Sequence, residues 1–141
     1  MPPRIDHVGI ATKNLEDSSL LWNLIGLKQC EDEIITEHDV RVRMFQGIDN
    51  DSNVTFSKIE LIEPLSENSP IAKFISNRGA GIQQIAINVQ NIQLVIEKLL
   101  KNNFRMINST PNIGSSGNLV AFIHPESTGG VLVELVQNRL Q

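Results

Sequence analysis

The sequence lacks several features that indicate particular kinds of protein. It holds a single cysteine, Cys30, so no disulfide can form within the chain and a reducing compartment is predicted. No apolar run approaches the roughly 20 residues that cross a bilayer, so no membrane partner is predicted. Residues 1–4 run directly into a strand-like segment and do not resemble a signal peptide. These absences predict a cytoplasmic protein.

An excess of basic residues is also missing. The formal net charge is −4, with Lys and Arg scattered along the chain. A nucleic-acid partner is therefore not expected, because such binding needs a basic face. Apolar residues make up 40% of the 141 residues, which is enough for a packed core. This length fits one domain, or two small repeats that share a core.

What the sequence does contain is a repeated pattern. Residues 5–11 and 82–88 both read as strands, and each is followed at the same offset by an Asn-Leu or Asn-Ile pair that opens a helical run. A second matched pair of strands, residues 58–62 and 132–136, closes each copy. The repeat predicts two modules with the order βαβββ.

Four side chains with metal-binding chemistry occupy equivalent positions in the two copies. The repeat aligns His7 with Gln84 and Glu60 with Glu134. Paired modules pack about a pseudo-twofold axis, so equivalent residues near the axis converge. Imidazole, carboxylate and carboxamide groups together suit a divalent ion such as Co, Ni, Mn, Zn or Mg. The carboxylates lie in apolar runs, where an isolated buried charge is costly.

Each of these residues also has an ordinary structural interpretation. A histidine on a strand is more often a core or rim residue, and a strand glutamate more often faces solvent. Gln84 is the weakest of the four as a ligand, because Gln83-Gln84 also suits solvent exposure or hydrogen bonding. The coincidence of the four positions across both copies favours the metal interpretation.

Three helices are predicted from capping residues and apolar spacing. The first has Asn14 as its N-cap and ends at Gly26, with Leu20, Leu21, Leu24 and Ile25 at helical spacing. The second begins at Ser69-Pro70 and ends near Gly79. The third spans 92–101 and is predicted to bury Val95, Ile96, Leu99 and Leu100. Further strands are predicted over 27–35, 40–45, 55–62, 105–108, 119–123 and 131–136, with a hairpin loop over 47–53.

At these residues the sequence resembles the vicinal oxygen chelate superfamily and, within it, the methylmalonyl-CoA epimerases. The likeness covers nearly the whole chain in order, and its carriers are residues 5–11, 58–65, 69–74, 81–86, 122–125 and 127–135. The resemblance implies an α+β fold in which two paired βαβββ modules form a cupped mixed sheet around a central cleft. It predicts a single domain over 1–141, with module one at about 4–64, a linker at 65–80 and module two at about 81–138.

The resemblance also implies roles for particular residues. Trp22 falls on a position that is aromatic and packed in the family, so the resemblance predicts a core residue there. His7, Glu60 and Glu134 fall on family metal-ligand positions, and Gln84 falls on a position where the epimerases have a histidine. Glutamine is a ligand type elsewhere in the superfamily, so Gln84 is predicted as the fourth ligand. Other departures are Glu126 and Asn118, near positions where the epimerases carry basic residues, and the loop Glu37-His38-Asp39 in place of Glu-Gln-Gly.

The implied function is a divalent-metal-dependent epimerase that inverts the α-carbon of a 2-methylmalonyl-CoA-type thioester. Glu134 is the first choice for the catalytic acid/base and Glu37 the second. His124 is interpreted as a turn residue that hydrogen-bonds the backbone. The predicted partners are a small acyl-CoA-type substrate and, by analogy with other paired-module proteins, a second copy in a homodimer. The alternatives are a glyoxalase-like isomerase or lyase of another small substrate, and a metal-free binding module of the same fold.

Overall fold

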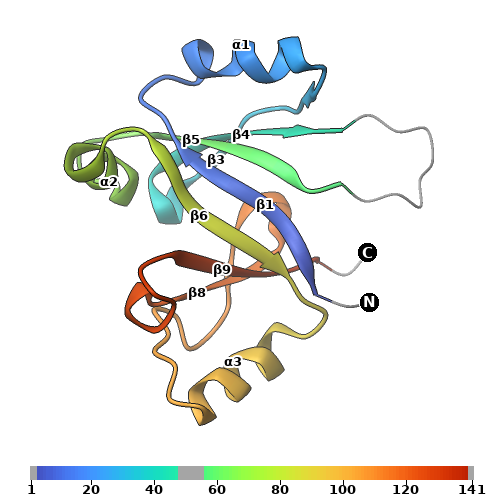
Figure 1. Cartoon of the computed structure of the whole chain (residues 1–141), viewed down its shortest axis with the longest axis vertical. Helices are drawn as coiled ribbons and strands as arrows, with labels where there is room; N and C mark the ends of the chain where they lie inside the picture. Colours follow the sequence, from blue (N-terminus) through green and yellow to red (C-terminus); the bar gives the residue numbers. More distant parts are fainter. Residues whose placement is uncertain (1–2, 48–55, 140–141) are drawn as a thin grey trace. The chain divides into compact units, whose positions relative to one another are not determined.

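The computed structural model describes residues 3–47 and 56–139, which form two compact units (Figure 1). The N-terminal unit runs from His7 to Gln83, and the C-terminal unit combines the residues from Gln84 onward with those up to Asp6. Part of the predicted hairpin loop at 47–53, and the start of the strand predicted at 55–62, lie outside the described residues. None of the helices in the described part is long and apolar enough to cross a membrane.

The N-terminal unit is a mixed sheet with one helix packed against each face. Its strand order is β2-β4-β5-β1, with β3 paired to β4 and only the β1–β5 pair parallel. Its elements are β1 (Arg4–Ala11), α1 (Leu15–Ile25), β2 (Lys28–Gln29), β3 (Glu33–Ile35), the short helix η1 (Thr36–His38), β4 (Val40–Gln46), β5 (Lys58–Pro64) and α2 (Pro70–Arg78).

The C-terminal unit repeats this plan. Its strand order is β6-β9-β8-β7, with β6 and β9 parallel and the other neighbours antiparallel. Its elements are β6 (Gly81–Asn88), α3 (Ile92–Lys101), β7 (Asn112–Ile113), the short helix η2 (Ser115–Gly117), β8 (Leu119–Ile123), the short helix η3 (Pro125–Ser127) and β9 (Leu132–Gln137). The predicted α+β fold of two paired βαβββ modules is confirmed.

An asparagine N-cap begins the main helix of each unit. The Asn14 side chain accepts a hydrogen bond from the backbone of Asp17, and Asn91 does the same for Leu94. The first backbone N–H of α1 also donates to the Glu63 carboxylate at 2.9 Å, and that of α3 donates to the Gln137 carboxamide at 2.8 Å. Each helix is thus tied to the end of the strand that carries the matched glutamate.

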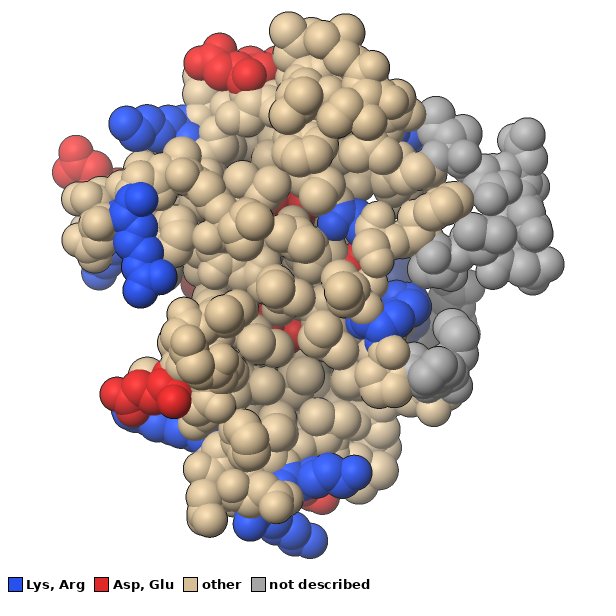
Figure 2. Space-filling view, in the orientation of Figure 1, with Lys and Arg blue, Asp and Glu red and all other residues tan. Residues whose placement is uncertain are grey.

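The face that α1 buries differs from the one its leucines suggest. Leu15 and Ser19 are buried against the sheet, whereas Leu20, Leu21, Leu24 and Ile25 are 57–76% exposed. Trp22 packs beside the buried cluster of Leu15, Phe45 and Leu61, as predicted. Figure 2 shows a stretch without charged side chains over α1, with acidic side chains at its N-terminal end.

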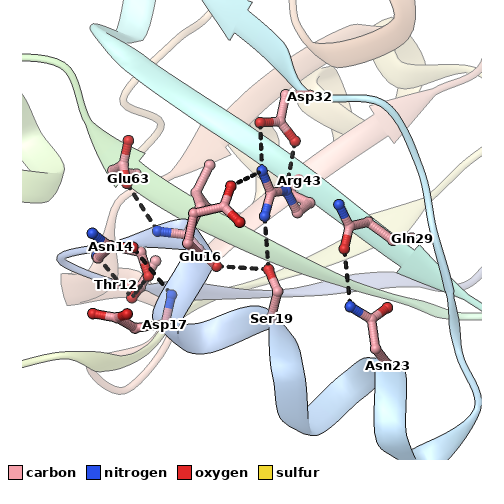
Figure 3. Close-up of polar contacts among 11 residues, drawn as sticks. Thr12, Asn14, Glu16, Asp17, Ser19, Asn23, Gln29, Asp32, Arg43 and Glu63 are labelled. Atoms are coloured by element: carbon pink, nitrogen blue, oxygen red, sulfur yellow. Dashed lines mark hydrogen bonds and ion pairs between the residues drawn. The ribbon is translucent and has the colours of Figure 1, made fainter.

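A buried arginine explains why α1 turns a serine inward. Arg43 of β4 is 6% exposed and donates to Asp32 at 2.6 and 2.8 Å, to Glu16 at 2.8 Å and to the Ser19 hydroxyl at 2.9 Å (Figure 3). Ser19 in turn donates to the carbonyl of Leu15. The cluster ties α1, β4 and the β2–β3 connection together through one cation.

Other departures from the predicted elements are local. The strand predicted at 27–35 is split into β2 and β3 around the Asp32 that binds Arg43. The strand predicted at 105–108 is reduced to one bridge between Met106 and Ile123. Helix α3 has the predicted bounds and buries Ile92 and Ile96, but Leu100 is 45% exposed and does not belong to its buried stripe.

Candidate functional site

The N-terminal unit brings His7 and Glu60 together on the sheet face opposite α1. Strands β1 and β5 are parallel, with Gly9 opposite Glu60 and His7 opposite Lys58. Ala11, on the same face as His7, joins a core cluster separate from the Leu15 cluster under α1. His7 and Glu60 are 4% and 5% exposed, and the His7 Nε2 atom lies 3.5 Å from the Glu60 Oε1 atom.

The 3.5 Å separation suits two ligands of one ion. It is longer than an ordinary N–H···O hydrogen bond of about 2.7–3.2 Å. Two ligand atoms bonded to one divalent ion at about 2.0–2.2 Å, with bond angles between octahedral and tetrahedral, lie roughly 3.0–3.5 Å apart. The His7 nitrogen and the Glu60 oxygen therefore have the chemistry and the spacing of a half-site for a divalent cation.

The C-terminal unit brings Gln84 and Glu134 together in the same register. Strands β6 and β9 are parallel, with Ala86 opposite Glu134, so Gln84 is offset from its glutamate by the same two residues as His7. Gln84 and Glu134 are each 6% exposed. Here the contact is a hydrogen bond, in which Gln84 Nε2 donates to Glu134 Oε1 at 2.9 Å.

All four predicted ligands are therefore buried, and they form two pairs. Each pair holds one carboxylate. Over residues 3–47 and 56–139, no group of three or more His, Cys, Asp or Glu side chains has the arrangement of a metal site. Burial of Glu60 and Glu134 excludes the solvent-exposed alternative for both residues. Their role as metal ligands stays a prediction.

Glu37, the predicted second base, lies away from the Glu60 pair. It is exposed in η1, which connects β3 to β4. Strand β4 begins at Val40, opposite Pro64, four residues along β5 from Glu60. That spacing corresponds to about 13 Å along the strand. The described structure does not bring Glu37 to Glu60, and its catalytic role also stays a prediction.

His124 has the structural role that its turn position predicts. Its Nδ1 atom accepts a hydrogen bond from the backbone N–H of Glu126 at 3.1 Å, which caps η3. Arg105 forms a 3.0 Å ion pair with the Glu126 side chain, so a cation lies beside this turn even though the residue after His-Pro is acidic.

Sequence reasoning missed one charged residue beside the His7–Glu60 pair. Lys58 lies opposite His7 in the register of β1 and β5, on the same sheet face as Glu60, and is partly buried. The signal was available, because Lys58 precedes Glu60 by two residues and side chains alternate along a strand. Lys58 places a cation next to the candidate ligands.

Comparison with known proteins identifies the family and shows which proteins this chain is similar to. Methylmalonyl-CoA epimerase, mitochondrial, of Dictyostelium discoideum is 40% identical over 134 residues, covering 94% of this chain and 76% of the relative. The uncharacterized protein YqjC of Bacillus subtilis is 36% identical, covering 95% of this chain and 91% of the relative.

A solved structure extends the likeness to the fold. A variant of Streptomyces coelicolor methylmalonyl-CoA epimerase, in complex with 2-nitronate-propionyl-CoA, matches with a TM-score of 0.89 and 30% identity over 97% of this chain and 98% of that one. These relatives confirm the prediction of an enzyme that resembles methylmalonyl-CoA epimerase. A family model matches residues 6–122. The chain belongs to the glyoxalase/bleomycin resistance protein/dioxygenase superfamily.

Proposed function

We propose that this protein is a divalent-metal-dependent epimerase of a 2-methylmalonyl-CoA-type thioester. The observation that carries the proposal is the pair of buried carboxylates, Glu60 and Glu134, at equivalent registers of the two modules. The 40% identity to a methylmalonyl-CoA epimerase supplies the substrate class. The compartment and a homodimer stay predictions, and some of the relatives are named as mitochondrial.

The donor set fits a divalent ion. The His7 nitrogen and the Glu60 oxygen have the spacing of two ligands, and Glu134 has the register position in the second module that Glu60 has in the first. We propose these three residues as ligands, with Gln84 beside Glu134, as the alignment of the two modules suggests. Bound there, a divalent ion would act as a Lewis acid for the charge that develops on the substrate oxygens.

The proposed chemistry at the substrate is a proton transfer in two directions. Glu134 removes the α-proton, the C–H electron pair moves toward the thioester carbonyl, and a proton is then returned to the opposite side of the carbon. Return from the opposite side needs a second acid, and Glu37 is the residue proposed for it. Lys58, beside His7, adds positive charge that favours binding of the substrate carboxylate.

The test measures metal and exchange separately. Metal content is determined on protein purified without chelator, and solvent deuterium incorporation into methylmalonyl-CoA is followed with and without added Co²⁺. Stoichiometric metal and metal-dependent exchange are expected. Metal without exchange would retain the metal site and reject the substrate, in favour of a glyoxalase-like isomerase or lyase.

One observation favours a second candidate, a metal-free binding module of the same fold. The Gln84 amide already supplies Glu134 with a hydrogen bond, so this carboxylate has a buried polar partner without a cation. The same experiment separates the candidates, because a binding module would show neither bound metal nor α-proton exchange.

A further inference from the structure

The outer face of α1 carries an apolar surface that the described residues leave uncovered. Four aliphatic side chains on it are each 57–76% exposed and lie next to one another at helical spacing. They are Leu20, Leu21, Leu24 and Ile25, and we call them the α1 patch. No charged residue occurs in the sequence between Asp17 and Lys28. Figure 2 shows this uncharged stretch over α1, with acidic side chains at the N-terminal end of the helix.

Helix α3, which has the equivalent place in the other module, has a different outer surface. It exposes Leu94, but the charged side chains of Glu97, Lys98 and Lys101 are exposed on the same helix. Such a mixture of charged and apolar groups is typical of a helix that faces water. The uncharged outer face of α1 is therefore not required by the fold plan that the two units share.

The α1 patch is large enough to belong to a protein interface. Four aliphatic residues exposed to this extent present roughly 450 Å² of contiguous surface, and the largest apolar patch of a typical monomer, about 300–600 Å², is often functional. Two such patches pressed together would bury about 900 Å² before any surrounding residue is counted, and specific interfaces begin at about 1,000 Å². A second copy of the chain therefore supplies the apolar area that a specific contact needs.

The residues of the α1 patch are also arranged symmetrically along the helix. Leu21 and Leu24 form an inner pair, and Leu20 and Ile25 form an outer pair with the same midpoint. When two antiparallel helices are related by a twofold axis at that midpoint, each residue lies opposite the other member of its pair in the second copy. This direction also keeps the Asp17 carboxylates of the two copies at opposite ends, whereas parallel helices would bring these like charges together.

We propose that the α1 patch is the contact between two copies of this chain, which pair antiparallel through α1. The proposal identifies a surface for the predicted homodimer and does not depend on the epimerase activity. A micromolar dissociation constant is expected, because the apolar area lies at the lower limit of specific interfaces. Each copy then folds by itself, and the melting temperature of dilute protein reports a single copy.

The test measures the mass of the full-length protein by sedimentation velocity over the micromolar to millimolar range. The mass of the unmodified protein should rise from 15.7 kDa to twice that value as its concentration increases. The variants Leu21→Glu and Leu24→Lys each place a charge against a leucine of the second copy, so the dissociation constant should rise by about 100-fold or more. The matched control is Leu94→Glu on α3, which is 60% exposed and should leave the dimer unchanged.

A mixture of the two variants tests the antiparallel pairing itself. The carboxylate introduced at position 21 of one copy would lie opposite the ammonium group introduced at position 24 of the other, while two leucines meet on the other side of the axis. The mixture should therefore form a dimer although neither variant does so alone. Each dilute variant should keep the melting temperature of the unmodified protein, because Leu21 and Leu24 are exposed in a single copy.

Three results would contradict the proposal. Unmodified protein that stays monomeric at millimolar concentration would overturn it and leave the α1 patch open to a different protein, and this measurement needs no variant to fold. Dimers of undiminished strength in both variants would show that the contact lies elsewhere. A mixture that stays monomeric would reject the antiparallel pairing. Loss or presence of α-proton exchange in methylmalonyl-CoA is measured separately, so the proposed activity can fail without affecting any of these results.

Discussion

Replacement of Arg43 by methionine tests whether α1 is held in place by a buried charge cluster. The change keeps an unbranched side chain of similar length and removes the bonds to Asp32, Glu16 and Ser19. The bidentate contact with Asp32 is the main loss, because the Asp32 side chain is only 30% exposed. The Glu16 side chain is 80% exposed, so its contact contributes little.

The expected cost is about 2–3 kcal/mol of unfolding free energy. Charge-assisted hydrogen bonds contribute about 1.5–3 kcal/mol each when buried, and the solvent beside Asp32 reduces that value. Ser19 adds little to the loss, since its hydroxyl still donates to the carbonyl of Leu15. Packing of the methionine side chain offsets part of the remainder.

The assay is urea unfolding followed by the fluorescence of Trp22, which lies on α1 and packs beside the Leu15 cluster. The matched control is Arg41→Met, two residues earlier on the same face of β4 and exposed, which should change stability by less than about 0.5 kcal/mol. The double variant Arg43→Met with Asp32→Asn should lose about 1–2 kcal/mol less stability than the sum of the two single variants, and this difference is the coupling energy of the pair. Equal stability of the Arg43 and Arg41 variants would refute the reasoning.

Three more perturbations follow from the same contacts. The Arg43 guanidinium lowers the pKa of Asp32 below 3.8, so the stabilisation by this pair is complete above the ordinary pKa and is lost as pH falls through the lowered one. In urea titrations the stability gap between unmodified protein and Asp32→Asn should therefore stay constant above about pH 5 and shrink as pH falls further. Asn14→Ala and Asn91→Ala each remove a helix N-cap and should each cost about 1 kcal/mol by calorimetry, whereas equal stability to the unmodified protein would deny the caps a role. Leu24→Lys should change the melting temperature little, because this side chain is 76% exposed, and a large loss would show that its face is covered in solution.

The sequence alone determined the local structure and the internal repeat. The bounds of α3 and β8 were predictable because caps, turn residues and apolar spacing act within a few residues. Burial of Glu60 and Glu134 was also predictable, since each lies in an apolar strand and the repeat aligns the two. The resemblance to the vicinal oxygen chelate superfamily predicted the fold and the enzyme class.

Tertiary structure decided which faces are buried and which groups meet. Four aliphatic residues of α1 point outward because Arg43, 24 residues from Ser19 in sequence, turns the serine side of the helix inward. The exposed position of Glu37 follows from the pairing of β3 with β4, which no local pattern specifies. The Gln84–Glu134 hydrogen bond spans 50 residues and depends on the parallel register of β6 and β9. The sequence alone showed which four side chains could bind a metal. The distances within each pair, 3.5 Å for His7–Glu60 and 2.9 Å for Gln84–Glu134, depend on the register of the strands.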